Sequence, residues 1–283
     1  MNTFTEPWTT RFIKAGSFRT RVLEAGDPEA EPVVLLHDGA WGGSASSSWS
    51  KLIPLLADRY RIIAPDLIGF GESAKAVVLD QAPVESRIDH LTDILTALGE
   101  RRPAHLVGCS FGGALGLRAI ARDQAPFAIR SVTSICGAGG AASRTPLAIR
   151  ELGNWNGTRD DLARILALLL DDAVPDFESL LDERLRCALQ PGHYRAVMAA
   201  SIPLPDELTR ANRDEWPQQL RGTTTPLHLV RGSRDVLLTD DWADQIARVR
   251  PDSAVTVLNS RHAPQLDHAD EVADALSSFF ETT

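Results

Sequence analysis

The segment LVGCSFGG at residues 106–113 constrains the fold of this chain most, because it sets a serine between glycines at the end of an apolar run. A strand that ends there and turns at once into a helix forces Ser110 into a strained backbone conformation. Glycines at positions 108 and 112 remove the Cβ atoms that would clash in so sharp a turn. The pattern G-x-S-x-G therefore predicts an exposed serine hydroxyl at a strand-to-helix turn. The alternative is an ordinary tight turn in which Ser110 only caps the helix.

Apolar runs and helical stripes alternate along most of the sequence. Runs typical of strands lie at 18–26, 32–37, 61–66, 104–109, 129–137, 226–232 and 253–260. Stripes typical of helices lie at 86–100, 112–122, 240–250 and 269–280. This alternation predicts an α/β fold with a mostly parallel central sheet flanked by helices.

One long stretch, residues 141–220, breaks the alternation. It holds no convincing strand but carries helical stripes at 160–172 and 177–189. We therefore expect a first part of the core over 1–140, an inserted helical lid over 141–220, and a second part of the core over 221–283. The small-residue segment GGSASSS at 42–48 is expected to be a loop.

Composition excludes several classes of protein. A chain of 283 residues with 43% hydrophobic content can bury a large core. The net charge of −9 argues against a nucleic-acid partner. Three cysteines without C-x-x-C spacing argue against a disulfide framework or a zinc site, and suit a reducing compartment.

The sequence predicts no targeting signal and no membrane-spanning segment. The start MNTFTEPWTTR lacks a basic region followed by an apolar one, so we expect no signal peptide. The aliphatic run ILALLL at 165–170 is too short to span a bilayer. These features predict a cytoplasmic protein that does not act on a membrane.

Ser110 needs a base to take its proton, and the base needs an orienting acid. His262 directly follows the last predicted strand, at the sheet edge where Ser110 lies. Open α/β sheets bind their ligands at this edge. The other histidines fit less well: His37 precedes a glycine-rich loop, His105 and His228 lie within strands, and we place His90, His193 and His268 on solvated faces of helices. His262 is the predicted base.

The orienting acid is expected in the loop after 226–232, where Asp235 lies. Asp240 and Asp241 fit the first turn of the following helix better. The loop after the preceding strand contains no carboxylate, which removes the main rival position. Asp235 could be a plain turn residue, but the order Ser, Asp, His at successive strand ends favours a catalytic triad.

Stabilising an oxyanion requires backbone N–H groups aimed at the developing charge. Phe111, directly after the predicted nucleophile, supplies one such group. Gly39 in HDGAWGG (37–43) is the candidate for the second. A plain glycine-rich loop is the alternative.

Together these residues resemble the α/β-hydrolase superfamily, and the likeness covers essentially the whole chain. Within it the chain resembles the meta-cleavage product hydrolases, which hydrolyse a C–C bond in vinylogous 1,5-diketones formed during aromatic-ring degradation. Four stretches carry the resemblance: RPAHLVGCSFGGALGL, CGAGG at 136–140, LLDERLRCALQPGHYRAVM at 180–198, and NSRHAPQLDHADEVADALSSFF. The third is similar to a lid helix that brings an arginine to the substrate, and implies that Arg184 grips a substrate carboxylate.

The sequence departs from the family pattern around the substrate. The family usually has H-G-G-G-P-G-A where this chain has HDGAWGG, which sets a carboxylate, Asp38, beside the oxyanion site. We expect Asp38 to turn outward or to find a cationic or N–H partner. The family's substrate-contacting asparagine is replaced by Cys109, and the tryptophan after the histidine by Ala263.

The resemblance implies hydrolysis of a C–C bond in a 2-hydroxy-6-oxo-dienoate-type small molecule, a ketone bearing a carboxylate. It implies no metal and no organic cofactor. Two alternatives stay open: a carboxylesterase or lactonase acting on a small apolar ester, and a small-molecule-binding protein of the same fold. The family is usually oligomeric, and a homo-oligomer is left open.

Overall fold

A computed structural model describes residues 6–171, 174–199, 202 and 215–283. Its centre is an eight-stranded sheet with the strand order β1-β2-β4-β3-β5-β6-β7-β8. β2 pairs antiparallel with β1 and with β4, and the strands from β4 to β8 pair in parallel. The strands are β1 (Thr9–Ala15), β2 (Phe18–Ala25), β3 (Glu31–Leu36), β4 (Tyr60–Pro65), β5 (Ala104–Cys109), β6 (Ile129–Ile135), β7 (Leu227–Gly232) and β8 (Ala254–Leu258). The predicted α/β class with a mostly parallel sheet is confirmed.

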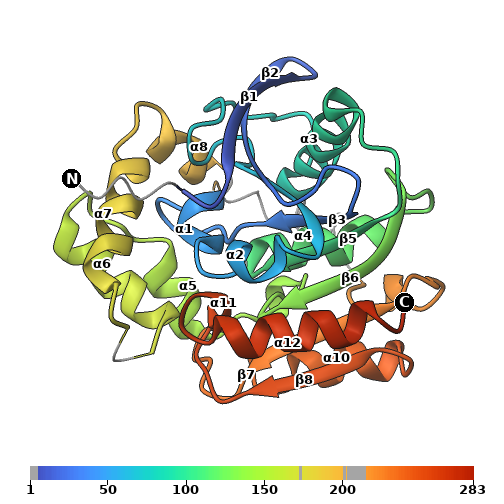
Figure 1. Cartoon of the computed structure of the whole chain (residues 1–283). Coiled ribbons are helices and arrows are strands. Elements are labelled where there is room, and N and C mark those ends of the chain that lie inside the picture. Colours follow the sequence, from blue (N-terminus) through green and yellow to red (C-terminus); the bar gives the residue numbers. More distant parts are fainter. Residues whose placement is uncertain (1–5, 172–173, 200–201, 203–214) are drawn as a thin grey trace.

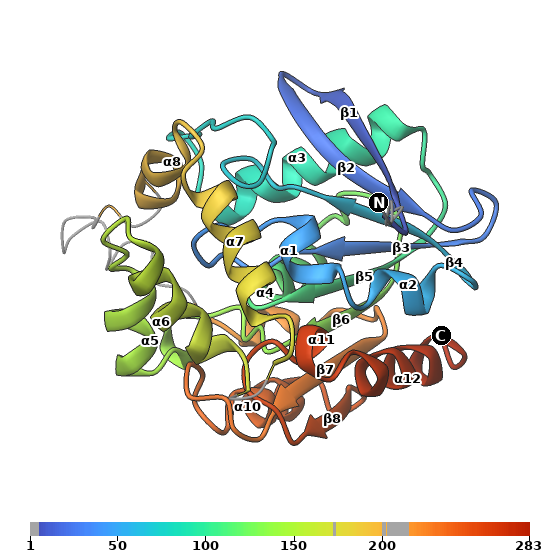
Figure 2. The same ribbon diagram turned by 60° about the vertical axis from the view of Figure 1, so that its left-hand side comes forward.

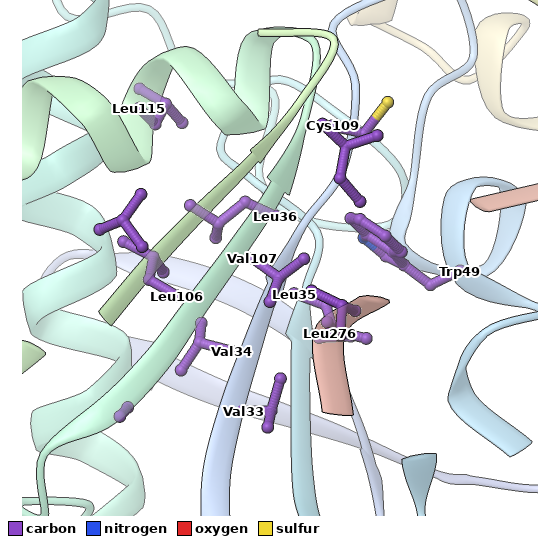
Figure 3. Packing of buried hydrophobic residues seen from close by; sticks show 14 of the residues in the cluster. Val33, Val34, Leu35, Leu36, Trp49, Leu106, Val107, Cys109, Leu115 and Leu276 are labelled. Atoms are coloured by element: carbon purple, nitrogen blue, oxygen red, sulfur yellow. The ribbon is translucent and has the colours of Figure 1, made fainter. Parts of the chain in front are cut away.

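Helices cover both faces of this sheet (Figure 1). α3 (Pro83–Leu98) and α4 (Phe111–Ile120) pack together on one face, whereas α2 (Ile53–Leu56) and α12 (Ala269–Phe280) pack on the other. α10 (Trp242–Val249) packs beside β7. Successive residues of a strand point to opposite faces, so the central strands read as continuous apolar runs. Figure 3 shows Leu35 on the side of Leu276 from α12, and Leu36 on the side of Leu115 from α4.

Four α-helices of the described residues are inserted between β6 and β7 and gather at one end of the sheet (Figure 2). They are α5 (Pro146–Leu152), α6 (Arg159–Leu169), α7 (Phe177–Ala188) and α8 (His193–Ala199). Among the described residues of this insertion there is no strand, as the sequence predicted. The insertion has its own apolar cluster, in which Leu166 and Leu181 pack with Trp41 and Ala263 of the main body. The part of the predicted lid at 203–214 lies outside the described residues.

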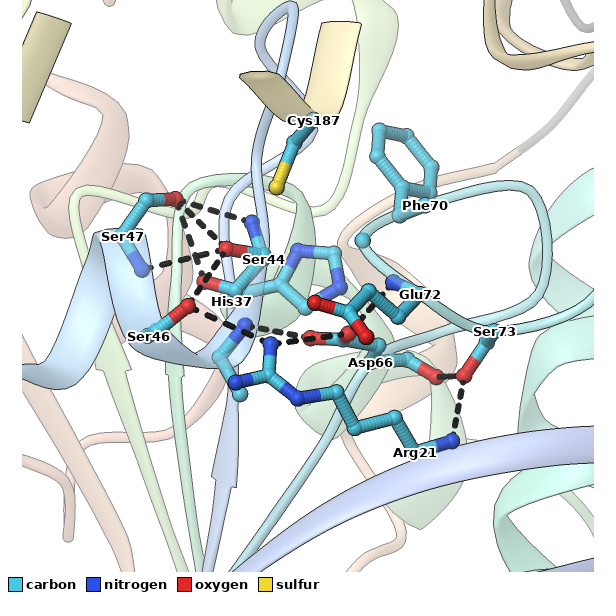
Figure 4. Close-up of polar contacts among 12 residues, drawn as sticks. Arg21, His37, Ser44, Ser46, Ser47, Asp66, Phe70, Glu72, Ser73 and Cys187 are labelled. Carbon is cyan, nitrogen blue, oxygen red and sulfur yellow. Dashed lines mark hydrogen bonds and ion pairs between the residues drawn. The ribbon is translucent and has the colours of Figure 1, made fainter. Parts of the chain in front are cut away.

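The expectation of a loop at 42–48 is wrong from residue 45 on, because a helix begins there. α1 (Ala45–Trp49) begins with a capping box in which the side chains of Ser44 and Ser47 each accept from the other's backbone N–H. Asp66 fixes the same turn, since its Oδ1 accepts from the Ala45 N–H at 2.7 Å (Figure 4). Serine disfavours helix interiors but suits N-terminal caps, so composition alone was misleading here.

We expect Gly112→Ala to destabilise the fold. A Cβ at Gly112 would lie 2.1 Å from the Leu36 carbonyl oxygen, so α4 would have to move away from β3. The expected loss is about 1–3 kcal/mol or more in the free energy of unfolding, measured by urea denaturation. Gly222→Ala is the matched control, because a Cβ at Gly222 meets nothing within 4 Å. Equal unfolding midpoints for the two variants would contradict close packing at Gly112.

Candidate active site

Ser110 occupies the sharp turn between β5 and α4, with φ 53° and ψ −112°. It is one of two non-glycine residues with positive φ in the described chain. The turn closes only because its neighbours are glycines: a Cβ at Gly108 would lie 2.1 Å from the backbone carbon of Gly112. The Ser110 N–H donates to the Ile135 carbonyl at 2.8 Å, which ties the turn to β6. The strained backbone thereby presents the hydroxyl at the carboxyl edge of the sheet.

The structure brings Ser110, His262 and Asp235 into one hydrogen-bonded line. Ser110 Oγ lies 2.8 Å from His262 Nε2, and His262 Nδ1 lies 2.7 Å from Asp235 Oδ2. Asp235 Oδ1 accepts from the Leu237 N–H at 2.8 Å, which fixes the carboxylate. Since Asp235 follows β7 and His262 follows β8, the three loops meet at one edge of the sheet. The arrangement can remove the Ser110 proton and return it to a leaving group.

Electrostatics suit His262 to the role of a base. Burial disfavours its charged form, but the charge and hydrogen bond of Asp235 outweigh this and raise the pKa of His262 above 6.5. Burial likewise opposes ionisation of Asp235, but interaction with His262 lowers the pKa of that carboxyl. Asp235 therefore stays ionised and stabilises the imidazolium that forms during proton transfer.

Gly39 and Phe111 lie side by side next to the nucleophile. A Cβ at Gly39 would lie 2.9 Å from Phe111 Cβ, so this approach requires glycine. Phe111 is the first residue of α4, where the backbone N–H has no partner within the helix and the helix dipole is positive. Within the described chain the Gly39 N–H donates no hydrogen bond to the backbone or to a side chain. Two donors are thus available for an oxyanion.

Asp38 and Arg184 form a buried ion pair at the loop of residues 37–43, which carries Gly39 and is called the oxyanion loop below. Arg184 Nη1 and Nη2 donate to Asp38 Oδ1 and Oδ2 at 3.1 Å and 2.6 Å. The two side chains are only 1% and 2% exposed, so the pair is closed to solvent. Burial opposes ionisation of Asp38, but the charge and hydrogen bonds of Arg184 hold the pKa of that carboxyl well below its usual range. The expectation that Asp38 has a cationic partner is confirmed, and its partner is the arginine assigned to the substrate.

Cys109 and Ala263, the other two positions assigned to the substrate, are both buried. The Cys109 thiol lies 3.8 Å from the His262 carbonyl, and burial raises its pKa well above 9.0. The Ala263 N–H donates to the Leu169 carbonyl at 2.9 Å, which links the histidine loop to α6. The structure places both residues beside His262 but shows neither as an exposed contact surface.

Two histidines that were predicted on solvated faces of helices, His90 and His193, are buried. His90 Nε2 lies 2.8 Å from Thr20 Oγ1, and burial lowers the pKa of His90 to about 4. His193 Nε2 accepts from the Gly42 N–H at 3.2 Å, which anchors the loop that carries Gly39. The prediction failed because α3 and α8 pack against neighbours that their own periodicity does not reveal. His268, by contrast, is partly exposed.

Two buried polar side chains near the site, Arg87 and Gln265, were not predicted from the sequence. The Arg87 guanidinium lies 5.3 Å from the centre of the Phe111 ring, and desolvation lowers its pKa to about 10. Gln265 lies close to the Cys109 thiol, and both polar atoms of its amide are buried without a hydrogen bond to the described residues. The only signal for Gln265 was its place three residues after His262. Arg87 gave none, because a charge in a helical stripe normally faces solvent.

Among the residues that the structure describes, two groups of side chains have metal-ligand composition. Cys136 lies beside Asp235 and His262, but burial raises the pKa of its thiol well above 9.0 and His262 Nδ1 is engaged by Asp235. Asp171, Asp267 and His268 form the second group, in which Asp171 also pairs with Arg234. A protonated thiol and a paired carboxylate are poor ligands, so neither group is a strong candidate for a metal centre.

Residues 33–275 match the model of the alpha/beta hydrolase family, and the chain belongs to that family. Over 273 residues it is 26% identical to a 2-hydroxy-6-oxo-6-(2'-aminophenyl)hexa-2,4-dienoic acid hydrolase of Metapseudomonas resinovorans, covering 96% of this chain and 91% of that one. It is 28% identical over 275 residues to a pimeloyl-[acyl-carrier protein] methyl ester esterase of Methylococcus capsulatus, covering 89% and 95%. A solved serine hydrolase involved in carbazole degradation superposes with a TM-score of 0.82 at 25% identity, over 98% of this chain and 100% of that one. The protein is therefore an enzyme, a hydrolase with the α/β-hydrolase fold.

Within the described part of the chain, no helix combines the length and the apolar character needed to cross a membrane.

We expect Ser110→Ala to remove turnover while the fold is retained. The hydroxyl is the group that the strained turn presents to His262, and loss of such a nucleophile costs on the order of 10⁴-fold in rate. Initial rates on a p-nitrophenyl acyl ester and the thermal unfolding midpoint measure the two effects. A folded variant that keeps roughly a tenth of the activity would show that Ser110 is not the nucleophile.

The pH profile should report the raised pKa of His262. The base must be neutral, so kcat/KM falls as the pH drops through that pKa, and the acid limb lies above 6.5. In Asp235→Asn the raising charge is gone while burial remains, so the limb should move to lower pH as the maximal rate falls. His268→Gln, at a histidine away from the triad, is the control and should leave the limb in place. A limb that moved only in the control would assign the base to His268.

Proposed function

We propose that this enzyme hydrolyses a C–C bond in a vinylogous diketone of the kind produced by aromatic-ring cleavage. The observation that carries the proposal is the hydrogen-bonded line of Ser110, His262 and Asp235 beside two free oxyanion donors. The class of substrate is supported by the likeness, over nearly the whole chain, to a dienoic acid hydrolase. Helices α5 to α8 would act as the lid of this site.

In the proposed mechanism the substrate first moves from its dienol to its keto form, with His262 handling the proton. Ser110 then attacks the carbonyl carbon while His262 takes the hydroxyl proton. The N–H groups of Gly39 and Phe111 hold the oxyanion. The C–C bond breaks, and its electron pair leaves as a delocalised dienolate that is protonated from His262. Water, activated by the same histidine, hydrolyses the acyl-enzyme and returns Ser110.

Hydrolysis of a small ester or lactone is the second candidate. It is favoured by one observation, the closed pair of Asp38 and Arg184. An arginine held by a protein carboxylate is not free to grip an acidic dienoate, whereas an uncharged ester needs no such group. The same triad serves both reactions, because both proceed through an acyl-enzyme.

The two candidates are separated by rates on matched compounds. We expect the enzyme to cleave the C–C bond of a 2-hydroxy-6-oxo-dienoate methyl ester with a higher kcat/KM than it hydrolyses a p-nitrophenyl acyl ester. Loss of the dienone absorbance measures the first reaction. Product analysis by mass spectrometry distinguishes C–C cleavage from hydrolysis of the methyl ester. Ser110→Ala should abolish both activities and serves as the background.

Turnover of the p-nitrophenyl ester without cleavage of any dienone C–C bond would overturn the C–C proposal and leave the esterase. Failure on both substrates, with specific binding of a dienone by the folded protein, would point to a small-molecule-binding protein instead.

A further inference from the structure

We propose that Asp38 takes the place of a substrate carboxylate at Arg184, so that the enzyme selects substrates that are uncharged at the end facing α7. This inference rests on the proposed function, since it names the substrate class of the same site. It starts from the geometry of the pair: both oxygens of Asp38 meet the two terminal nitrogens of Arg184 in a bidentate contact. Such a fork-to-fork contact is the way an arginine binds a carboxylate ligand.

The remaining hydrogen-bonding capacity of Asp38 is also used. Its Oδ1 accepts from the Ala40 N–H at 2.9 Å, and its Oδ2 accepts from the Ser48 hydroxyl at 2.7 Å. Asp38 is thus held from the oxyanion loop, from α1 and from α7 at once. A substrate carboxylate would have to displace a fully bonded, ionised internal group in order to reach the same edge of Arg184. We expect this exchange to be unfavourable.

The pair belongs to the site and not to a distant part of the lid. Asp38 precedes Gly39, and its negative charge contributes to raising the pKa of His262. The backbone of Arg184 meets the same loop: a Cβ at Gly42 would lie 2.0 Å from the Arg184 carbonyl oxygen. Whatever approaches Ser110 beneath α7 therefore approaches the pair.

The charge of Asp38 disfavours a substrate carboxylate at Arg184. Asp38 is paired with Arg184, Asp235 is hydrogen-bonded to His262, and a second guanidinium, Arg87, lies 5.3 Å from the centre of the Phe111 ring. A carboxylate that approached Arg184 would therefore face the negative charge of Asp38. The buried polar atoms without a partner in the described chain include both polar atoms of the Gln265 amide, which is neutral and suits a carbonyl or hydroxyl oxygen.

The test compares two substrates that share one scissile bond, a 2-hydroxy-6-oxo-dienoate and its methyl ester. Wild-type enzyme should have the higher kcat/KM on the methyl ester. Asp38→Asn removes the competing charge, so Arg184 becomes available and the acid-to-ester ratio of kcat/KM should rise roughly 30-fold or more. Adding Arg184→Gln to Asp38→Asn should cancel this rise, because the gain depends on the freed guanidinium.

Asp66→Asn is the matched control. Asp66 also forms a buried pair with an arginine, Arg21, at 3.4 Å, but it lies beneath α1 (Figure 4). It should change stability without changing the acid-to-ester ratio. If Asp38→Asn fails to fold, Asp38→Gly, which restores the glycine usual at this position, replaces it.

The inference fails if wild-type enzyme prefers the free acid, or if the ratio is unchanged in the folded Asp38 variants. If wild-type enzyme prefers the acid and Arg87→Gln abolishes that preference, the substrate carboxylate binds at Arg87 near Phe111, and the inference is wrong. Failure of C–C hydrolysis would contradict the proposed function but not this inference. The same comparison can be made with two p-nitrophenyl esters, one whose acyl chain ends in a carboxylate and one in which that carboxylate is a methyl ester. A preference for the uncharged ester there, reversed in Asp38→Asn, would support the inference even without C–C cleavage.

Discussion

The strained backbone of Ser110 is the constraint on which the rest of the structure depends. A residue at φ 53° between a strand and a helix is tolerated only where the surroundings leave no alternative. Here α4 lies so close to the sheet that a Cβ at Gly112 would strike β3, and a Cβ at Gly137 would lie 2.6 Å from the Ser110 carbonyl oxygen. The close packing therefore fixes three things together: the direction of the Ser110 hydroxyl, the position of the Phe111 N–H, and the place of the positive N-terminal end of the α4 dipole.

The inserted helices contact two of the loops around this turn. α7 contacts the oxyanion loop through the backbone of Arg184, and His193, at the start of α8, accepts from the Gly42 N–H. α6 accepts a hydrogen bond from Ala263, the residue after His262. The insertion thus contacts the loop that carries Gly39 and the loop that carries His262. A movement of these helices would change the geometry of the oxyanion donors as well as access of the substrate.

The departure from the family pattern at position 38 acts through the contact of Asp38 with Arg184. A carboxylate beside an oxyanion site would raise the barrier to attack if it were free, and Arg184 cancels that effect. On our proposal, this pairing keeps Arg184 from binding a substrate carboxylate. The carboxylate at position 38 would then leave the donors around Ser110 in place and change what the site recognises.

The sequence by itself determined the strands from β2 to β8, most of the longer helices, the turn at Ser110, and the strand ends that carry Asp235 and His262. These are local properties, set by apolar periodicity and by glycines that permit one backbone geometry. It did not determine the edge strand β1, that Asp38 meets Arg184, that His90 and His193 are buried, or that a helix begins at Ala45. Asp38 and Arg184 stand 146 residues apart and belong to different layers. Their contact exists only because α7 packs onto the loop after β3, and no local pattern encodes which side chains such a long-range contact brings together.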